Sequence, residues 1–542
     1  MDIADVARAW LADDPDPAGR AEIQALLDGL PGTAEELRDR FAGPLTFGTA
    51  GLRGRLRAGP NGMNLAVVTR AAAGLVGWLA AAGGQGPLVI GYDARHGSRA
   101  FAERTAEVAT GAGRDALLLP RPLPTPVLAH AVRALDAVAG VMVTASHNPP
   151  QDNGYKVYLG AALGGRSGAG AQIVPPADAE IEAAIQAVGA LTDVELGAPG
   201  TVLDDKIIDG YVRSAASVLP AGPRALTVAY TPLHGVGGDV LAAAFAAAGF
   251  PAPHMVAEQA APDPDFPTVA FPNPEEKGAM DLLLALATAT AADIAIANDP
   301  DADRCAVAVP HSDGWRALTG DQLGALLADR LIAAGRPGTF ATTIVSSTML
   351  RAICTARGVP YNETLTGFKW IVRAADDLAY GYEEALGYCV APEIVRDKDG
   401  ITAALVVADL AATLKAEGRT LADRLDDLDV EFGIHRTDQL SVRVDDLAKI
   451  TESMAHLRSK PPAELLGEPV TFEDLLPAND ILRLTTANAR VVIRPSGTEP
   501  KLKAYLEVVR PATRDTLAES RRDADAAMTT LRAETAAALG LT

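Results

Sequence analysis

The chain has 542 residues, of which 48% are hydrophobic and 22% charged, which is the composition of a globular protein too long for a single hydrophobic core. Its formal net charge of −21 argues against nucleic acid or an anionic membrane as a partner. Its apolar runs fall short of the roughly 20 residues that cross a bilayer. Its N-terminal segment is acidic, whereas a signal peptide begins with basic residues. Because its three cysteines are also far apart, we expect a protein of the reducing cytoplasm.

The N-terminal part begins with helical spacing over residues 1–40, followed by a glycine-rich loop over 47–62. Buried strands are expected at 87–93 and 137–144, with a helix over 99–113 between them. Ser146 stands just past the second strand. Because ligands bind at the carboxyl ends of strands in open α/β sheets, we expect Ser146 at a binding edge.

Two further expectations concern the neighbours of Ser146. The Asn153-Gly154 pair predicts a tight turn that brings Lys156 back toward Ser146. A Ser146–His147 catalytic pair is not expected, because neighbours on an extended chain point in different directions. The G-x-S-x-G elbow of the α/β-hydrolases is also missing. Taken alone, the segment is equally compatible with a surface turn.

A second unit has strands at 225–231 and 292–297 around a helix at 239–249. Its second strand leads into N-D-P-D-A-D-R, in which Asp299, Asp301 and Asp303 alternate with small residues. On a bent loop, three carboxylates at this spacing form an incomplete oxygen shell of the kind that Mg²⁺ accepts. The letters fit neither an EF-hand nor the D-x-D-x-T pattern of aspartyl-phosphate phosphatases, and a solvated acidic turn remains the alternative.

A third unit begins with a strand at 339–345 and ends in a helix over 401–418. Between them T-L-T-G-F-K-W offers Lys369, and Y-E-E-A-L-G-Y offers Glu383 and Glu384. Adjacent carboxylates are more often one solvated acid and one partnered acid than a catalytic pair. Strands that alternate with helices in this way predict parallel α/β sheets.

The C-terminal part has strands at 489–494 and 501–509 and then a charged helix over 514–538, which predicts a smaller α+β domain. The loop between the strands carries a guanidinium, two hydroxyls and backbone N–H groups, which together suit a phosphate. Its residues are Arg494, Ser496, Gly497 and Thr498, and Lys501 and Lys503 follow. A hairpin turn with a charged rim is the alternative.

The fold class that follows is α/β, with three parallel-sheet α/β domains and a smaller C-terminal α+β domain. We expect these domains at residues 1–200, 201–318, 319–430 and 431–542, with boundaries good to about ten residues.

The motifs T-A-S-H-N-P, D-P-D-A-D-R, Y-E-E-A-L-G-Y and R-P-S-G-T-E-P occur in this order, one in each expected domain, after F-G-T-A-G-L-R-G at 47–54. Together they resemble the α-D-phosphohexomutase superfamily over about residues 45–510. The wording G-T-A-G-L-R-G, T-G-F-K-W and E-E-A-L-G-Y is similar to the phosphoglucomutase branch that includes the phosphopentomutases. The resemblance implies four domains around a central cleft and an intramolecular phosphotransferase, a phosphosugar mutase.

The resemblance also implies roles for individual residues. Ser146 would carry the phosphate, and one Mg²⁺ would bind its phosphoserine oxygen and the three aspartates, Asp299, Asp301 and Asp303. The remaining assignments are Arg53, Lys156 and Arg304 for the transferring phosphoryl, Lys369 and, second to it, His147 for acid–base transfer, Glu383 for sugar hydroxyls, and Arg494, Ser496, Gly497, Thr498 and Lys503 for the phosphate that does not react.

The implied reaction interconverts sugar 1-phosphate and 6-phosphate through a sugar 1,6-bisphosphate, which would also be the activator. Glucose is the expected sugar, with mannose or a pentose 1-/5-phosphate as further substrates. Ala385 and Tyr388 depart from patterns of relatives and leave the sugar preference open. The expected partners are phosphorylated sugars, with the chain a monomer or homodimer. A phosphosugar hydrolase and a non-catalytic sugar-phosphate sensor are the alternative functions.

Overall fold

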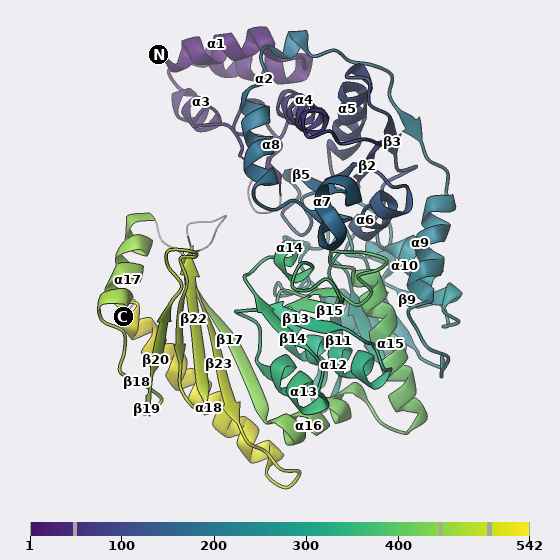
Figure 1. Ribbon diagram of the computed structural model, residues 1–542, viewed down its shortest axis with the longest axis vertical. Coiled ribbons are helices and arrows are strands. Elements are labelled where there is room, and N and C mark those ends of the chain that lie inside the picture. Colours follow the sequence, from purple (N-terminus) through teal and green to yellow (C-terminus); the bar gives the residue numbers. More distant parts are fainter. Residues whose placement is uncertain (1, 47–50, 444–446, 496–500, 541–542) are drawn as a thin grey trace.

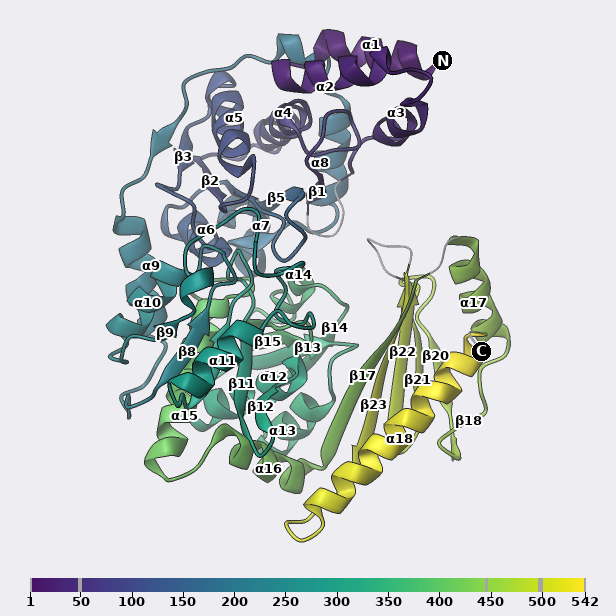
Figure 2. The same ribbon diagram turned by 180° about the vertical axis from the view of Figure 1, so that it is seen from behind.

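The computed structural model describes residues 2–46, 51–443, 447–495 and 501–540. Figures 1 and 2 show a row of sheets, each covered by helices, with the C-terminal sheet standing beside the rest and joined to it at one end. The predicted fold class, three α/β domains and a smaller C-terminal α+β domain, is confirmed. None of the described helices is both long and apolar enough to cross a bilayer.

The first sheet has the strand order β1-β5-β4-β2-β3-β7, with β6 paired to β5. Strands β4, β2, β3 and β7 run parallel, whereas β5 runs antiparallel to both β4 and β1. The sheet is therefore mixed rather than purely parallel. Its strands are β1 (Leu52–Arg55), β2 (Leu88–Tyr92), β3 (Ala116–Leu118), β4 (Ala139–Val143), β5 (Asp152–Leu159), β6 (Ala171–Gln172) and β7 (Thr201–Val202).

Helices α4 to α8 cover this sheet, and α1 to α3 form a small cluster of their own at the N-terminal end (Figure 1). Asp2 and Asp16 start α1 and α2 by accepting hydrogen bonds from backbone N–H groups of the first turn. The helices are α1 (Ile3–Asp13), α2 (Pro17–Asp28), α3 (Ala34–Arg40), α4 (Leu65–Ala81), α5 (Ser98–Gly111), α6 (Thr125–Ala134), α7 (Ala161–Gly168) and α8 (Ala177–Gln186).

The second sheet has the order β12-β11-β10-β8-β9, in which β8, β9 and β10 are parallel and β11 and β12 are antiparallel additions. Its strands are β8 (Val228–Thr231), β9 (His254–Met255), β10 (Ile294–Ala297), β11 (Ala306–His311) and β12 (Gly314–Ala317), and its helices are α9 (Lys206–Ala216), α10 (Gly238–Ala247) and α11 (Asp281–Ala289).

The third sheet has the order β14-β13-β15-β16, with only β16 antiparallel to its neighbour. Its strands are β13 (Thr339–Thr343), β14 (Tyr361–Thr364), β15 (Leu378–Glu383) and β16 (Gly387–Cys389), and its helices are α12 (Gly320–Ala333), α13 (Met349–Arg357), α14 (Phe368–Ile371), α15 (Gly400–Ala416) and α16 (Leu421–Phe432). The second and third sheets share one continuous apolar core, to which helix α15 contributes, buried along most of its length.

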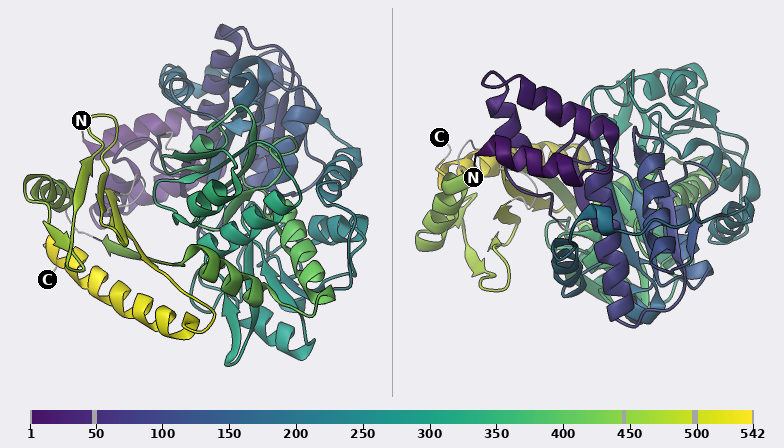
Figure 3. Two further views of the ribbon diagram at one scale, coloured as in Figure 1. Left: turned by 60° about the horizontal axis from the view of Figure 1, so that its bottom comes forward. Right: turned by 90° about the horizontal axis from the view of Figure 1, so that it is seen from above.

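The C-terminal sheet is antiparallel, in the order β17-β23-β22-β21-β20, and α18 lies along one of its faces (Figure 3). It has an apolar core of its own. Its elements are β17 (Ile434–Arg443), α17 (Leu447–Ser459), β18 (Glu464–Leu465), β19 (Glu468–Pro469), β20 (Thr471–Asp474), β21 (Leu482–Thr485), β22 (Ala489–Pro495), β23 (Lys501–Arg510) and α18 (Leu517–Ala538).

Candidate active site

The chain turns sharply at Ser146, directly after the buried strand β4. Ser146 has φ of +52°, a left-handed conformation that is uncommon outside glycine. Its N–H donates to Thr144 Oγ1 at 2.9 Å, and its hydroxyl donates to Asp299 Oδ2 at 2.6 Å. Its Oγ also lies 3.1 Å from His147 Nδ1. The expectation that Ser146 and His147 diverge is therefore wrong, because the backbone at Ser146 is not extended.

Arg95, which the sequence pattern did not single out, binds the backbone carbonyls of the Ser146 loop. Its guanidinium donates to the carbonyl of Ser146 at 2.6 Å and to that of Pro149 at 2.7 Å. The same group stacks on Phe266 of the second unit, 4.9 Å from the ring centroid. The signal in the sequence was an arginine just beyond the end of strand 87–93, at the same sheet edge as Ser146.

Lys156 reaches the site along a strand rather than after a turn. Asn153 and Gly154 lie inside β5, so the predicted tight turn is wrong, and the chain reverses over residues 146–151 instead. Lys156 Nζ lies 2.8 Å from Asp301 Oδ2 and 3.1 Å from Asp303 Oδ2. Burial lowers the pKa of Lys156, but the two carboxylates more than offset it, so the ammonium stays charged.

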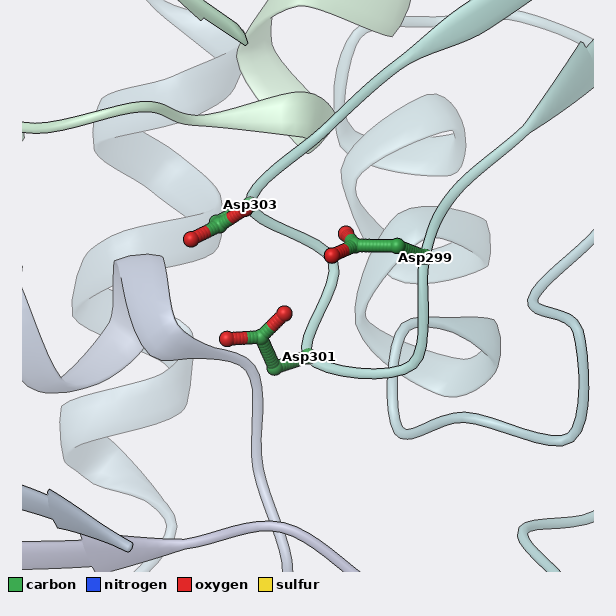
Figure 4. A group of neighbouring side chains, drawn as sticks. All are labelled: Asp299, Asp301 and Asp303. Carbon is green, nitrogen blue, oxygen red and sulfur yellow. The ribbon is translucent and has the colours of Figure 1, made fainter. Parts of the chain in front are cut away.

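Asp299, Asp301 and Asp303 form the loop after β10, and Figure 4 shows their carboxylates turned toward one another. Each offers an oxygen that lies within 4.8 Å of the others, and all three side chains are buried. The solvated acidic turn is thereby excluded. One oxygen each of Asp301 and Asp303 is buried without a hydrogen-bond partner in the described part of the chain. Unsatisfied, converging carboxylate oxygens fit a hard divalent cation.

The surroundings of these carboxylates shift the pKa values of Asp299 and Asp301 in opposite directions. Burial and the neighbouring charges of Asp301 and Asp303 raise the pKa of Asp299 well above its usual range. Asp301 accepts from Thr125 Oγ1 at 2.7 Å, and together with Lys156 this keeps its pKa below the usual range despite burial. Without a cation, Asp299 is thus the group that holds a proton.

Arg53 contacts the Ser146 loop, and Arg304 directly follows the aspartate loop. Arg53 donates to Asn148 Oδ1 at 3.1 Å, while the backbone of Arg304 donates to Asp299 Oδ1 at 3.0 Å and bridges to Gly387 of β16. Burial and both arginines lower the pKa of His147 well below its usual range, so the imidazole is neutral at pH 7. A neutral imidazole beside a hydroxyl can accept a proton.

Glu383 and Glu384 at the end of β15 have different surroundings. Glu384 accepts from Ser346 Oγ at 3.0 Å, whereas burial raises the pKa of Glu383 to about 7 against the pull of Lys398 and Arg304. Tyr388 is fully buried, and its hydroxyl donates to the carbonyl of Gly320 at 3.2 Å. Tyr388 therefore belongs to the core and offers no contact to a ligand.

Lys369 lies elsewhere than its expected role suggests. It is part of α14, and its Nζ is 3.8 Å from Asp178 Oδ2 of α8. Burial lowers its pKa, and Asp178 opposes that change. Among the described residues, the polar contact of its ammonium is to Asp178, and none is to Ser146 or the aspartate loop.

The nearest ammonium besides Lys156 belongs to Lys398, a second residue that the sequence analysis did not identify. Its Nζ is 3.2 Å from Asp303 Oδ2 and 3.8 Å from Asp397 Oδ1. Asp397 in turn accepts from the hydroxyl of Tyr158 at 2.9 Å, which ties α15's leading loop to β5. The charged run R-D-K-D-G at 396–400, buried throughout, was the available signal.

Arg494 stands at the end of β22, opposite Lys503 of β23. One of its N–H groups donates to the hydroxyl of Tyr505 at 3.2 Å, and its Nε is buried without a partner in the described residues. Burial raises the pKa of Glu384 and the positive charge of Arg494 opposes this rise, so the guanidinium of Arg494 lies near the end of β15. The other expected members of this loop, Ser496, Gly497 and Thr498, lie outside the described residues.

Comparison with known proteins covers nearly the whole chain. Family models match as "Phosphoglucomutase/phosphomannomutase, alpha/beta/alpha domain I" at residues 44–191, as domain II at 209–314, as domain III at 319–430 and as the C-terminal domain at 440–524. A protein named "Probable phosphomannomutase" from Haemophilus influenzae is 49% identical over 82% of this chain and 93% of its own.

Other relatives carry other sugar names. The phosphopentomutase of Homo sapiens is 34% identical over 93% of this chain and 90% of its own length. A phosphoglucomutase of Staphylococcus aureus is 33% identical over 88% of this chain and 92% of its own length. The open form of parafusin from Paramecium, a phosphoglucomutase, shares the fold with a TM-score of 0.70 at 18% identity, over 92% of this chain and 95% of that structure.

Proposed function

This chain belongs to the phosphoglucomutase/phosphomannomutase family and is a phosphosugar mutase, and we propose that it interconverts glucose 1-phosphate and glucose 6-phosphate through a phosphorylated Ser146. The observation that carries the role of Ser146 is its 2.6 Å hydrogen bond to Asp299 within a buried set of carboxylates and cations. Mannose and pentose phosphates are the next candidates, because relatives bear those names.

The donor set of Asp299, Asp301 and Asp303 supports a Mg²⁺ ion, one per chain, with an oxygen of the phosphorylated Ser146 as a further ligand. Bound there, the ion would supply positive charge against the oxygens of the phosphoryl group. Its binding would also favour the ionised form of Asp299, whose proton the surrounding carboxylates otherwise retain.

In the proposed reaction a sugar hydroxyl attacks the phosphorus of phosphorylated Ser146. The new P–O bond to the sugar forms as the P–Oγ bond breaks, and the hydroxyl proton ends on Ser146 Oγ. His147 is placed to relay that proton, since its neutral Nδ1 lies 3.1 Å from Oγ. Lys369, the first acid–base candidate from the sequence, becomes the second here, because its ammonium lies beside Asp178, although it has the lowered pKa that a base requires.

Lys156, Arg304 and Arg53 would hold the transferring phosphoryl group by charge and position rather than by bond making. Each lies within the same group of buried charges as Ser146 and the aspartates. The resulting sugar 1,6-bisphosphate would turn end for end and return its other phosphate to Ser146. The same compound, supplied from outside, would prime an unphosphorylated enzyme.

Glu383 would accept hydrogen bonds from sugar hydroxyls, while Arg494 and Lys503 would hold the phosphate that does not react, together with Ser496, Gly497 and Thr498. The unpartnered Nε of Arg494 supports this assignment, because a buried guanidinium N–H requires an acceptor. Since either phosphate of the bisphosphate must use this site, Arg494→Ala should weaken glucose 1-phosphate and glucose 6-phosphate equally.

The test compares wild type with Ser146→Ala in a coupled assay for glucose 6-phosphate formation, with free phosphate measured in parallel. We expect intact-mass and phosphopeptide analysis to place one phosphate on Ser146 and Ser146→Ala to lose activity. Release of free phosphate as fast as glucose 6-phosphate would instead indicate a hydrolase. Full activity of Ser146→Ala would overturn the proposal, and comparison of kcat/KM over glucose, mannose and pentose 1-phosphates assigns the sugar.

A further inference from the structure

A cavity with several charged lining residues lies at the start of β17, where the C-terminal unit joins the rest of the molecule. Figure 2 shows β17 beginning next to α16 at this junction. The cavity has a volume of about 160 Å³ and is walled by β12, α12, α16, β17 and α18. Its charged lining combines three arginines, Arg316, Arg436 and Arg521, with three carboxylates, Asp321, Asp429 and Asp525, and His435 lies beside them. Along the sheet, His435 pairs with Val509 while Ser441 pairs with Lys503 beside Arg494, so the cavity lies about 20 Å from the proposed phosphate site.

Two of the arginines are paired with aspartates that also line the cavity. Arg436 Nε lies 2.8 Å from Asp525 Oδ1, and Arg521 Nη2 lies 2.6 Å from Asp429 Oδ2. His435 uses Nδ1 to contact Glu507 Oε1 and Thr348 Oγ1, each at 3.1 Å. These groups are therefore held in place by their own partners, and they fix the shape of the cavity.

Arg316 is different. No hydrogen bond or ion pair is found for its guanidinium within the described residues, and its Nε is shielded from solvent without an acceptor. Burial and the nearby charge of Arg521 lower the pKa of Arg316, and Asp426 and Asp429 only partly offset this. A buried donor without an acceptor costs free energy, and an ordered water or a bound ion is its usual explanation.

We propose that this cavity binds a small anion, a phosphate or a short dicarboxylate, held between Arg316 of β12 and Arg436 and Arg521 of the C-terminal unit. An engineered cavity of about 150 Å³ holds benzene, which sets the size of ligand that fits. Thr319 lines the same space and offers a hydroxyl donor to the anion, whereas Ser347 Oγ already donates to Glu507 at 2.7 Å.

The position of the site gives it a consequence for catalysis that goes beyond the proposed reaction. Arg316 is part of the sheet whose strand β10 carries the aspartate loop, and Arg436 and Arg521 are part of the unit that carries Arg494. An anion bound by both sides ties these two units together. Because Arg494 and the aspartate loop must act on one substrate, anion binding changes the affinity for sugar phosphate.

The experiment titrates the full-length enzyme by calorimetry with sodium malonate and, separately, with inorganic phosphate. It compares wild type, Arg316→Met and the matched control Arg213→Met, an exposed arginine of α9. We expect wild type and Arg213→Met to bind one of the two anions equally well and Arg316→Met to bind it at least tenfold more weakly, as for a lost charged hydrogen bond. Inorganic phosphate can also enter the Ser146 site, so only the difference between the variants is interpreted.

If wild type and Arg316→Met bind malonate with equal affinity and also bind phosphate with equal affinity, the proposal that Arg316 forms an anion site is wrong. If Arg316→Met does not fold, Arg316→Gln keeps a side-chain donor and takes its place. The KM for glucose 1-phosphate is then measured with and without the bound anion at fixed free Mg²⁺. A shift in wild type that is lost in Arg316→Met supports the coupling, and binding without any shift overturns the coupling alone. Failure of the mutase proposal leaves the calorimetric result standing.

Discussion

At the scale of single residues, the site depends on charges placed close together without water between them. Asp299, Asp301 and Asp303 repel one another at these separations, and Lys156 and Lys398 offset only part of that repulsion. A divalent cation removes the remainder. The aspartates therefore contribute to metal affinity through charge as well as through the number of oxygen ligands.

Replacing Asp301 with Asn should lower kcat/KM about 10²-fold or more, in line with the loss of one preorganised electrostatic partner. The change leaves the shape almost intact but removes one negative charge and leaves Lys156 with one carboxylate instead of two. The measurement is activity over a range of Mg²⁺ concentrations, with exposed Asp313→Asn as the control. An Asp301→Asn enzyme with unchanged Mg²⁺ dependence would show that the triad does not hold the metal.

Glu383 predicts a pH dependence of substrate affinity. Its pKa is raised from 4.5 to about 7, chiefly by burial, so the carboxylate that accepts sugar hydroxyls is lost as pH falls below 7. If only the ionised form binds, KM at pH 6 should be about tenfold higher than at pH 8. The sign for folding is opposite: the folded state binds the proton more tightly, so this group favours folding at low pH and that contribution is lost as pH rises through 7.

The control for this prediction is Glu383→Gln, which cannot ionise. Its KM profile should keep only the pH dependence that comes from the substrate phosphate, whose second pKa is about 6. A wild-type profile that is superimposable on the Glu383→Gln profile would contradict the assignment.

The residues of the candidate site could be predicted where one short segment contains the whole motif. They could not be predicted where the contacting residues come from segments far apart in the sequence. Ser146 and the three aspartates each follow a strand that the hydrophobic pattern reveals. Arg95 meets Ser146 across neighbouring strands of the first sheet, and Lys398 meets Asp303 only after the second and third units have packed, so no local spacing encodes either approach. The contact between Ser146 and His147 depends on one positive φ angle, which a serine seldom adopts and a sequence pattern does not report.

At the scale of elements, the N-terminal helices α1 to α3 precede the residues that match the family models, yet they contact the loop after β1, the strand that carries Arg53. Arg40 of α3 pairs with Glu22 and Glu36 and donates to the carbonyl of Ala58, while Glu22 accepts from the N–H of Ala58 at 3.2 Å. The backbone carbonyl and N–H of Ala58 are thus both hydrogen-bonded to side chains of the N-terminal helices. We call this set of contacts, which holds the loop after β1 in place, the clamp.

Arg40→Met should therefore destabilise the protein by about 1–3 kcal/mol, since it leaves a buried carbonyl unpaired while the ion pairs, whose acids are partly exposed, contribute little. The aliphatic stem of Arg40 is preserved in Met. Urea unfolding of Arg40→Met is compared with Arg38→Met, an exposed arginine of the same helix. Equal midpoints for the two variants would mean that the clamp does not contribute to stability.

The sequence pattern located most elements and missed a few for physical reasons. Strands β2, β4, β10, β13, β22 and β23 were expected within a few residues of their observed bounds. The glycine-rich pattern of residues 47–62 predicts a loop where the structure has strand β1. This strand contains one glycine, Gly54, and one apolar residue, Leu52, and its pairing with β5 supplies the stability that its composition lacks. The antiparallel strands β5, β11, β12 and β16 were not foreseen, because alternation reports burial and not direction.

At the scale of the whole molecule, the apolar cores divide the chain unequally. One core runs from α6 and α9 through the second and third sheets to α16, whereas the C-terminal unit has a separate core under α18. The contact between them is mixed: a small apolar cluster joins Ile344 and Val345 of the third unit to Ile481, Val492 and Tyr505 of the C-terminal unit, and Arg490 donates to the carbonyl of Ile344 at 3.2 Å. Because each side keeps a larger core of its own, the two sides can unfold separately.

Calorimetry should accordingly show a separate transition for the C-terminal unit. Leu531→Ala removes a fully buried side chain of α18 and should destabilise that transition by about 2–5 kcal/mol while leaving the other in place. Leu405→Ala in α15 is the matched control and should shift only the transition of the shared core. A single transition that both substitutions lower equally would contradict the division.

The long ladder between β17 and β23 has a consequence for the chain while it is being made. The edge strand β17 pairs along its full length with β23, and residues 444–500 are made between the two strands. At about 5–20 residues per second, roughly 3 to 13 seconds separate the end of β17 from the end of β23 during synthesis. The Ser146 loop and the aspartate loop precede both strands in the chain, whereas Arg494 lacks its neighbouring strand until β23 is made. The proposed phosphate site is thus the last part of the candidate active site to be completed during synthesis.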